Sequence, residues 1–333
     1  MQKAKWYRQK ENICICECCP NECRIAPHQS GLCGTYTNIG QQLWNQRYYR
    51  FSSICIDPIE KKPLYHFFPG SSILSLGGYG CNLTCFYCQN HSISQNNSLG
   101  DTLSPESIVA EARKHHAVGV ALTYNEPLVN IETAVDLFSF CQKNNLQTVL
   151  VTNGYVNEKP LLDLVPFVDA VNIDLKFSST ASYKKYAGGQ LEPVINAIKI
   201  CTQHCSTEVT HLVVPGINDS ASSIDDICNL ISSINPSIPV HFSAYYPQWK
   251  SRIPATAPEL IQSICQQAKK TLSFVYGGNI SPYCDPDLHN TYCPTCHSLW
   301  IERMQSRIRI HNITHNTCSI CGRNITEFKG LES

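Results

Sequence analysis

The chain has 333 residues, enough for two ordinary domains or one barrel-sized domain with appendages, and its 26 Lys plus Arg balance its 26 Asp plus Glu. This neutral charge argues against strong DNA binding, and 43% hydrophobic residues indicate a globular protein. The longest apolar runs, such as residues 117–122, are far shorter than the ~20 residues that span a bilayer, so no integral membrane protein is expected. Residues 1–12 lack the apolar core of a secretory signal, which predicts a cytoplasmic location.

Short apolar runs alternate with helical stretches through the middle of the chain. In chain order, we expect strands at residues 73–76, 118–123, 147–151, 168–173, 208–214, 240–243 and 274–276. Helices are expected at residues 105–116, 128–143, 192–202, 222–233 and 258–271. Ser104 and Pro105 mark the start of the first helix, because Ser caps helices and Pro suits their first position. The alternation predicts βαβ units and a parallel sheet, and six or more such units favour an open or closed β/α barrel.

The 20 cysteines are the most informative feature of the composition. Without a signal peptide they are better explained as metal thiolates than as disulfides. Eleven of them form three clusters: Cys16, Cys19, Cys23 and Cys33; Cys81, Cys85 and Cys88; and Cys293, Cys296, Cys318 and Cys321. The other nine are expected to be mostly small buried hydrophobes. Residues 1–50 and 281–333 have too few periodic apolar positions to hold a core without metal, so both flanks are predicted to be metal-stabilised appendages.

The central cluster has the spacing CxxxCxxC, formed by Cys81, Cys85 and Cys88, with Tyr87 just before the third cysteine. Iron–sulfur cubanes are normally held by four thiolates, so three ligands in one loop leave one iron without a protein ligand and able to bind a substrate. A structural zinc site, with His91 as the fourth ligand, is the alternative.

This motif resembles the cluster loop of the radical SAM enzymes. Together with residues 56–64, 69–71, 124–127 and 151–154, it resembles the AmmeMemoRadiSam system radical SAM enzyme, a group related to pyruvate formate-lyase activating enzymes. The resemblance implies a partial (β/α)6 barrel at residues 56–280, between a cysteine-rich segment at 1–55 and a zinc-ribbon-like segment at 281–333. It also implies a [4Fe-4S] cluster and S-adenosylmethionine, which is cleaved by one electron to a 5′-deoxyadenosyl radical.

The same resemblance implies a radical reaction that abstracts hydrogen from an unknown substrate. It further implies association with Memo-type and AMME-type proteins and an electron donor such as flavodoxin or ferredoxin. A glycyl-radical-enzyme activase is the first alternative function. A zinc-ribbon nucleic-acid or protein-binding module without catalysis is the second, although the intact central cysteines argue against it.

The resemblance also implies cofactor-binding residues, all expected at the carboxyl ends of strands, where β/α barrels build their sites. They are Tyr87, Glu126, Asn153, Asp174, Lys176 and His241. Glu126 matches the segment that holds the methionyl amino group, although Tyr124 and Asn125 replace its two usual glycines; helix capping is the alternative role. For His241, the alternative to a cofactor contact is an ordinary histidine of the core, which the sequence predicts equally well. Val151 replaces the Asp that helps hold a monovalent cation in the activase relatives, so such a cation is doubtful here.

The two terminal clusters differ in regularity. Cys293 with Cys296 and Cys318 with Cys321 form two CxxC pairs separated by 21 residues, which predicts one tetrahedral thiolate site for zinc or iron; free cysteines are the alternative. The N-terminal set is Cys16, Cys19, Cys23 and Cys33. Because Cys14 and Cys18 lie beside it, the choice of ligands is ambiguous, and we expect a metal of unknown kind.

Overall fold

The structure of the chain is a computed structural model that describes residues 1–96, 98–281, 283–304 and 307–331. The chain forms two compact units. Unit 1 comprises residues 1–57, 72–171 and 179–205, and unit 2 comprises residues 58–71, 172–178 and 206–333. These bounds differ from the predicted division at residues 55 and 280, which stays a prediction about the chain's domains.

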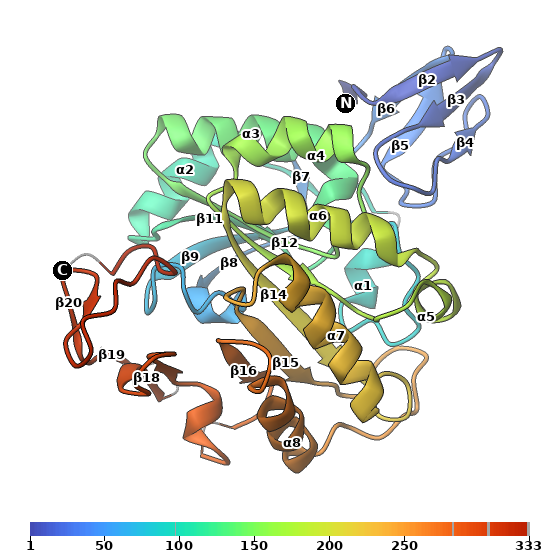
Figure 1. The fold of residues 1–333 in the computed structure, drawn as a ribbon. Helices are drawn as coiled ribbons and strands as arrows, with labels where there is room; N and C mark the ends of the chain where they lie inside the picture. Colours follow the sequence, from blue (N-terminus) through green and yellow to red (C-terminus); the bar gives the residue numbers. More distant parts are fainter. Residues whose placement is uncertain (97, 282, 305–306, 332–333) are drawn as a thin grey trace. The chain divides into compact units, whose positions relative to one another are not determined.

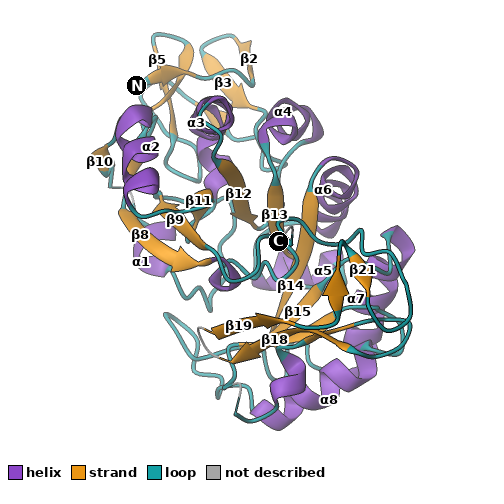
Figure 2. Ribbon diagram, turned by 90° about the vertical axis from the view of Figure 1, so that its left-hand side faces the viewer, coloured by secondary structure: helices purple, strands orange, loops and turns teal. Residues whose placement is uncertain are grey.

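The centre of unit 1 is a parallel sheet. In it β11 (Gly119–Thr123) pairs on one side with β9 (Ser72–Gly77) and on the other with β12 (Gln147–Thr152). All five residues of β11 are buried, as expected for a parallel strand with both faces covered. Helices α2 (Pro105–Lys114) and α3 (Ile131–Lys143) pack against these strands (Figure 2). The strands predicted at residues 73–76, 118–123 and 147–151 are confirmed.

The helices of unit 1 mostly begin where the sequence predicts. Ser104 caps α2, its Oγ accepting the N–H of Ser107 at 3.1 Å. The helix predicted at residues 128–143 is divided into a 3₁₀ turn, η2 (Pro127–Asn130), and α3. Helix α6 (Leu191–His204) confirms the prediction at 192–202. Three short helices and one 3₁₀ turn were not predicted from the sequence: α1 (His91–Ser94), α4 (Glu158–Leu164), α5 (Thr180–Tyr186) and η3 (Val165–Phe167).

The N-terminal flank of unit 1 has more regular structure than the sequence predicts (Figure 1). Two antiparallel three-stranded sheets have the orders β2-β3-β4 and β1-β6-β5, and β7 pairs with β10. Their bounds are β1 (Gln2–Lys3), β2 (Tyr7–Lys10), β3 (Ile13–Cys16), β4 (Arg24–Ile25), β5 (Tyr36–Ile39), β6 (Gln42–Asn45), β7 (Arg50–Phe51) and β10 (Asp101–Thr102). Strand β8 (Ser53–Pro58) follows. Tyr36 and Leu43 are buried, and the Tyr36 hydroxyl donates to Glu132 Oε2 in α3 at 2.8 Å, so the flank packs against the rest of unit 1.

The centre of unit 2 is also parallel. Strand β15 (Val240–Ala244) pairs with β14 (Ser206–Val213) and with β16 (Val275–Gly278), and α8 (Pro258–Ala268) packs on β15 and β16. Helix α7 (Ala221–Ile234) packs against α8. Strand β13 (Ala170–Asp174) belongs to unit 2 from residue 172, and η1 (Ile59–Lys61) lies in the short early segment of this unit. The predicted helix and strand order is confirmed here too.

The last part of unit 2 is antiparallel. Its elements are η4 (Pro286–Leu288), β17 (Thr291–Tyr292), β18 (Leu299–Met304), β19 (Arg307–Ile310), β20 (Ile313–Thr314) and β21 (Thr317–Cys318). Trp300 and Ile301 form a buried cluster with Phe274 and Tyr276 next to β16. The early segment also joins this part, since the N–H of Phe68 donates to the carbonyl of Lys329 at 2.8 Å. The result is an α/β fold with parallel strands and a cysteine cluster near the C-terminus, as predicted.

No helix among the residues described above is both long and apolar enough to cross a membrane.

Candidate functional site

The three central cysteines lie in the loop that follows β9 in unit 1. Cys85 is buried, and Cys81 and Cys88 are half-buried. Gly80, which begins the loop, has φ +90°, and a Cβ there would lie 2.3 Å from the carbonyl oxygen of Cys33. A side chain at this position would therefore force the loop away from the N-terminal flank.

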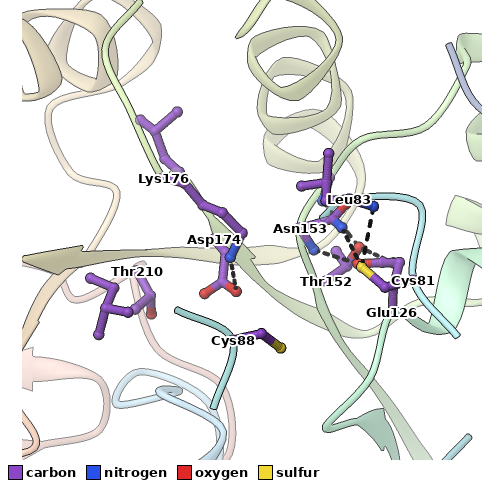
Figure 3. A network of polar contacts seen from close by, with 12 residues as sticks. Cys81, Leu83, Cys88, Glu126, Thr152, Asn153, Asp174, Lys176 and Thr210 are labelled. Atoms are coloured by element: carbon purple, nitrogen blue, oxygen red, sulfur yellow. Dashed lines mark hydrogen bonds and ion pairs between the residues drawn. The ribbon is translucent and has the colours of Figure 1, made fainter. Parts of the chain in front are cut away.

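Two N–H donors are directed at the sulfur of Cys81 (Figure 3). The Leu83 N–H lies 3.4 Å from Cys81 Sγ, and Asn153 Nδ2, from the residue after β12, lies 3.6 Å away. The Cys88 Sγ lies 3.1 Å from Ser94 Oγ in α1. Such donors stabilise thiolate charge, and hydrogen bonds to sulfur also tune the reduction potential of iron–sulfur clusters.

Asn82 joins this loop to the residues after β12, a role that the sequence did not predict. Its Oδ1 accepts from Asn153 Nδ2 at 2.9 Å, and its Nδ2 donates to the carbonyl of Tyr155 at 2.6 Å. The predicted residue Asn153 is therefore next to the central cysteines. The only sequence signal for Asn82 was its place inside the cysteine motif.

Glu126 is buried at the end of β11 and accepts three hydrogen bonds (Figure 3). Its Oε1 accepts from the Leu128 N–H at 3.0 Å and from the Thr152 hydroxyl at 2.6 Å, and its Oε2 accepts from the Asn153 N–H at 2.7 Å. It thus caps η2, which was the alternative role. The cofactor contact predicted for it stays a prediction.

The residues beside Glu126 and Cys88 are also held in place. Tyr124 has φ +72°, a backbone conformation that favours glycine, which accounts for the glycine expected there from the resemblance. Asn125 Oδ1 accepts from the Gly78 N–H at 2.8 Å, so the turn after β11 is attached to the turn after β9. Tyr87 is buried, with its ring edge-on to Phe86.

In unit 2, the predicted residues Asp174 and Lys176 form an ion pair at the end of β13. Lys176 Nζ lies 3.0 Å from Asp174 Oδ2 (Figure 3). Asn218 Nδ2 donates to the Lys176 carbonyl at 3.0 Å, and Asn218 Oδ1 accepts from the Val214 N–H at 2.7 Å. The turn after β14 therefore holds the backbone of this pair.

His241 does not lie at the carboxyl end of its strand, so that expectation is wrong. It is the second residue of β15, because the strand already begins at Val240 and runs to Ala244. His241 is 2% exposed, and its Nε2 lies 2.7 Å from Glu208 Oε2. Burial alone would raise the pKa of Glu208, but His241 and His66 hold it below its usual value. The structure supports a core histidine, and a cofactor contact for His241 stays a prediction.

The four C-terminal cysteines form a tight group. Their Sγ atoms all lie within 4.8 Å of one another, with 3.7 Å between Cys293 and Cys321 and between Cys296 and Cys318. Zinc bound to four thiolates at about 2.3 Å separates the sulfurs by about 3.8 Å. The Ser298 hydroxyl lies 3.2 Å from Cys296 Sγ and lowers the pKa of that thiol. The spacing of the four sulfurs suits one metal ion held by all of them.

The predicted N-terminal cysteines meet at one pocket in unit 1. The pocket is lined by Cys16, Cys18, Cys19, Cys23 and Cys33 together with Asn21, Ile25, Gly31, Leu32, Tyr36, Asn82, Leu128 and Val129. A hydrogen bond from the Cys18 thiol holds the pKa of Cys16 below its ordinary value, although burial acts in the opposite direction. Burial raises the pKa of Cys33 to about 11.

Comparison with known proteins identifies the family. Residues 76–231 match the radical SAM superfamily. An uncharacterized protein of Methanocaldococcus jannaschii is 36% identical over 338 residues, covering 98% of this chain and 99% of that protein. This chain belongs to the radical SAM superfamily.

Named radical SAM relatives match over shorter stretches. The pyruvate formate-lyase 1-activating enzyme of Escherichia coli is 26% identical over 153 residues, covering 43% of this chain and 62% of that enzyme. The (2S)-3-sulfopropanediol dehydratase activating enzyme of Klebsiella oxytoca is 27% identical over 139 residues, covering 40% of this chain and 44% of that enzyme. The chain thus spans less than two thirds of either activating enzyme.

A solved structure shows the same fold. Streptococcus suis SuiB bound to S-adenosylmethionine superposes with a TM-score of 0.51 and 13% identity, covering 67% of this chain and 55% of SuiB. The superfamily implies a [4Fe-4S] cluster and S-adenosylmethionine, and its named members here are enzymes.

Proposed function

We propose that this chain is a radical SAM enzyme in which Cys81, Cys85 and Cys88 hold a [4Fe-4S] cluster. The observation that carries the proposal is the loop after β9, where three cysteines lie within eight residues and the first sulfur receives N–H donors from Leu83 and Asn153. Such a cluster with bound S-adenosylmethionine supplies a 5′-deoxyadenosyl radical for hydrogen abstraction.

The donor set fits a cluster better than a zinc ion. Among the described residues, the C-terminal four are the one group of three or more cysteine, histidine or carboxylate ligands drawn within 4.8 Å. Cys81, Cys85, Cys88 and His91 are therefore too far apart to surround a single ion. Cubane ligands lie farther apart, since each thiolate binds a different iron.

The remaining predicted residues have positioning roles in this proposal. Asn153 and Asn82 hold the cysteine loop against the end of β12. Asp174 and Lys176 offer a charged pair to S-adenosylmethionine, and Glu126 and Tyr87 shape the ends of β11 and of the cysteine loop. Exclusion of water by such residues protects a radical from side reactions.

The reaction is tested by detecting 5′-deoxyadenosine. Anaerobically reconstituted chain, reduced with dithionite, is expected to convert S-adenosylmethionine to 5′-deoxyadenosine and methionine. The Cys81→Ala/Cys85→Ala/Cys88→Ala variant should make none, whereas Cys55→Ala, which changes an exposed cysteine, should retain the activity. Product formation by the triple variant, or no product from fully reconstituted wild type, would refute the enzyme proposal.

A glycyl-radical activase is the second candidate, because several of the matched relatives, including the two described above, are named as activating enzymes. Its substrate would be a backbone glycine of a partner protein. A glycine-centred doublet in the electron paramagnetic resonance spectrum of a co-purified partner would favour this function. The wider proposal also includes zinc at the C-terminal cysteines, a cytoplasmic location, Memo-type and AMME-type partners, and a flavodoxin or ferredoxin as electron donor.

A further inference from the structure

Helix α1 supports the cysteine loop at both of its ends, and the proposed reaction gives this helix no role. The N–H of Gly80, the residue before Cys81, donates to the carbonyl of Ile93 at 3.0 Å. At the other end of the loop, Ser94 Oγ lies 3.1 Å from Cys88 Sγ. A helix of only four residues therefore contacts the loop next to its first cysteine and at its last.

The residues after α1 hold it against the rest of unit 1. Gln95 Nε2 donates to the carbonyl of Leu83 at 3.3 Å. Arg47, which is buried, donates from Nη2 to the carbonyl of Asn96 at 3.1 Å. The backbone that carries the Ser94 side chain is therefore fixed from two directions.

The hydroxyl of Ser94 is directed at sulfur and not at the helix backbone. A serine inside a helix commonly donates its hydroxyl to the carbonyl four residues earlier. Here that carbonyl, of Asn90, accepts the N–H of Ser94 at 2.9 Å, and among the described residues Cys88 Sγ is the hydrogen-bond partner of the hydroxyl. Ser94 is 6% exposed, so little water competes for this bond.

Metal binding sets the direction of the hydrogen bond between Ser94 and Cys88. A free thiol and a hydroxyl can each donate to the other. A cysteine that binds iron has lost its proton, because metal binding displaces thiol protons. With a cluster bound, the Ser94 hydroxyl therefore donates to the Cys88 thiolate, and a hydrogen bond to a charged acceptor is stronger than one between neutral groups.

The two donors at Cys81 differ from Ser94 in distance and in their other contacts. The Leu83 N–H, 3.4 Å from Cys81 Sγ, belongs to the backbone, which a side-chain substitution leaves in place. Asn153 Nδ2, 3.6 Å from the same sulfur, also donates to Asn82 Oδ1 at 2.9 Å. Removing the Ser94 hydroxyl, by contrast, removes a shorter contact to sulfur and breaks no other hydrogen bond among the described residues.

We propose that Ser94 is a positioning residue that raises the reduction potential of the [4Fe-4S] cluster by donating a hydrogen bond to Cys88. This inference rests on the proposed function, because it requires a cluster at Cys81, Cys85 and Cys88. Reduction adds one negative charge to the cluster and its thiolates, so a donor directed at a sulfur stabilises the reduced state more than the oxidised state. Ser94 thereby allows an electron donor of given potential to reduce a larger fraction of the enzyme.

A redox titration of the full chain, followed by electron paramagnetic resonance, measures this role without any turnover. After anaerobic reconstitution, wild type and Ser94→Ala should each hold about four irons. At a fixed potential, Ser94→Ala should have an about tenfold lower ratio of reduced to oxidised cluster, which is a midpoint potential about 59 mV lower for one electron. Ser92→Ala, which changes an exposed serine of the same helix, should titrate like wild type.

A second pair of variants tests the hydroxyl at constant side-chain shape. Ser94→Thr keeps the hydroxyl, whereas Ser94→Val has nearly the same shape without it. Ser94→Thr should have the potential of wild type, and Ser94→Val should show the same tenfold lower ratio as Ser94→Ala. This pair decides the question if Ser94→Ala, with its smaller side chain, does not retain iron.

The outcomes separate this inference from the proposed reaction. Equal potentials in Ser94→Thr and Ser94→Val would overturn the role of the hydroxyl and leave the proposed reaction intact. An equally large shift in Ser92→Ala would overturn it too, because the effect would then belong to the helix as a whole. A wild-type chain that binds no iron would instead refute the proposed cluster, and its iron content distinguishes this result from the other two.

Discussion

At the scale of single residues, Glu126 determines how the end of β11 is held. Because its two oxygens accept from Leu128, Thr152 and Asn153, a Gln at this position replaces one acceptor with an NH₂ group that faces a donor. We expect Glu126→Gln to lower the free energy of unfolding by about 1–3 kcal/mol even without cofactor. Chemical denaturation measures this, and Glu11→Gln, which changes an exposed turn residue, should have little effect. Unchanged stability would exclude the capping role.

His66 should make the stability of unit 2 sensitive to acid. It is fully buried, its Nε2 lies 2.7 Å from the Tyr276 hydroxyl, and burial lowers its pKa to about 4. Since this pKa lies below the unfolded value of about 6.5, the neutral ring stabilises the fold fully above about pH 6.5, and this contribution is lost as the pH falls toward 4.

The expected size is about 1 kcal/mol of unfolding free energy between about pH 7.5 and about pH 5.5. Comparing denaturation of wild type and His66→Gln at both values isolates this contribution, because other groups titrate alike in the two proteins. His204→Gln, which changes an exposed histidine at the end of α6, should follow wild type. An equal loss in His66→Gln would show that other groups cause the acid sensitivity.

The sequence predicted the cysteines of the site but not the pairs of side chains that hydrogen-bond around them. The motif indicated the three central cysteines, because their spacing carries the chemistry. It did not indicate that Asn82 binds Asn153, or that His241 binds Glu208, since the partners in each pair lie far apart in the sequence. Such pairs depend on strand register, which no local pattern contains.

At the scale of elements, the C-terminal cysteines should organise the antiparallel part of unit 2. Cys293 and Cys318 belong to the same buried cluster as Trp300 and Tyr276. Cys318→Ser should therefore reduce bound zinc from about one per chain to nearly none and expose residues 291–331 to proteases, because structural thiolate sites contribute folding energy.

Elemental analysis and limited proteolysis measure both effects. Cys284→Ser is the matched control, since it changes an exposed cysteine of the same segment outside the group of four. Zinc retained by Cys318→Ser would contradict the four-thiolate site.

Helices and strands were predicted correctly where residues within the element itself signal its type and its ends. Helix α2 was predicted because Ser104 and Pro105 mark its start locally. Helices α4 and α5 are only seven residues long each, too short for a periodic pattern to stand out. The strands of the N-terminal flank were missed because most have two to four residues, and their burial depends on partners elsewhere in the chain.

At the scale of the whole molecule, two kinds of metal chemistry should be separable in one preparation. Zinc has no redox chemistry, whereas iron–sulfur clusters exchange electrons. Treatment with ferricyanide in air should therefore remove the visible absorption and most of the iron while about one zinc per chain remains. Metal analysis after desalting checks this result, and a parallel loss of zinc would show that the C-terminal site depends on the central cluster.

The path of the chain through unit 2 has a consequence for its synthesis. His66 and Phe68 form backbone hydrogen bonds with Lys329, close to the C-terminal end. A ribosome adds about 5–20 residues per second, so residues 58–71 wait on the order of tens of seconds for their partner. Unit 1 ends at residue 205, and all the cysteines of its two clusters have then been made. In the nascent chain, unit 1, with the cysteines proposed to hold the [4Fe-4S] cluster, is therefore complete before the backbone partner of residues 58–71 has been made.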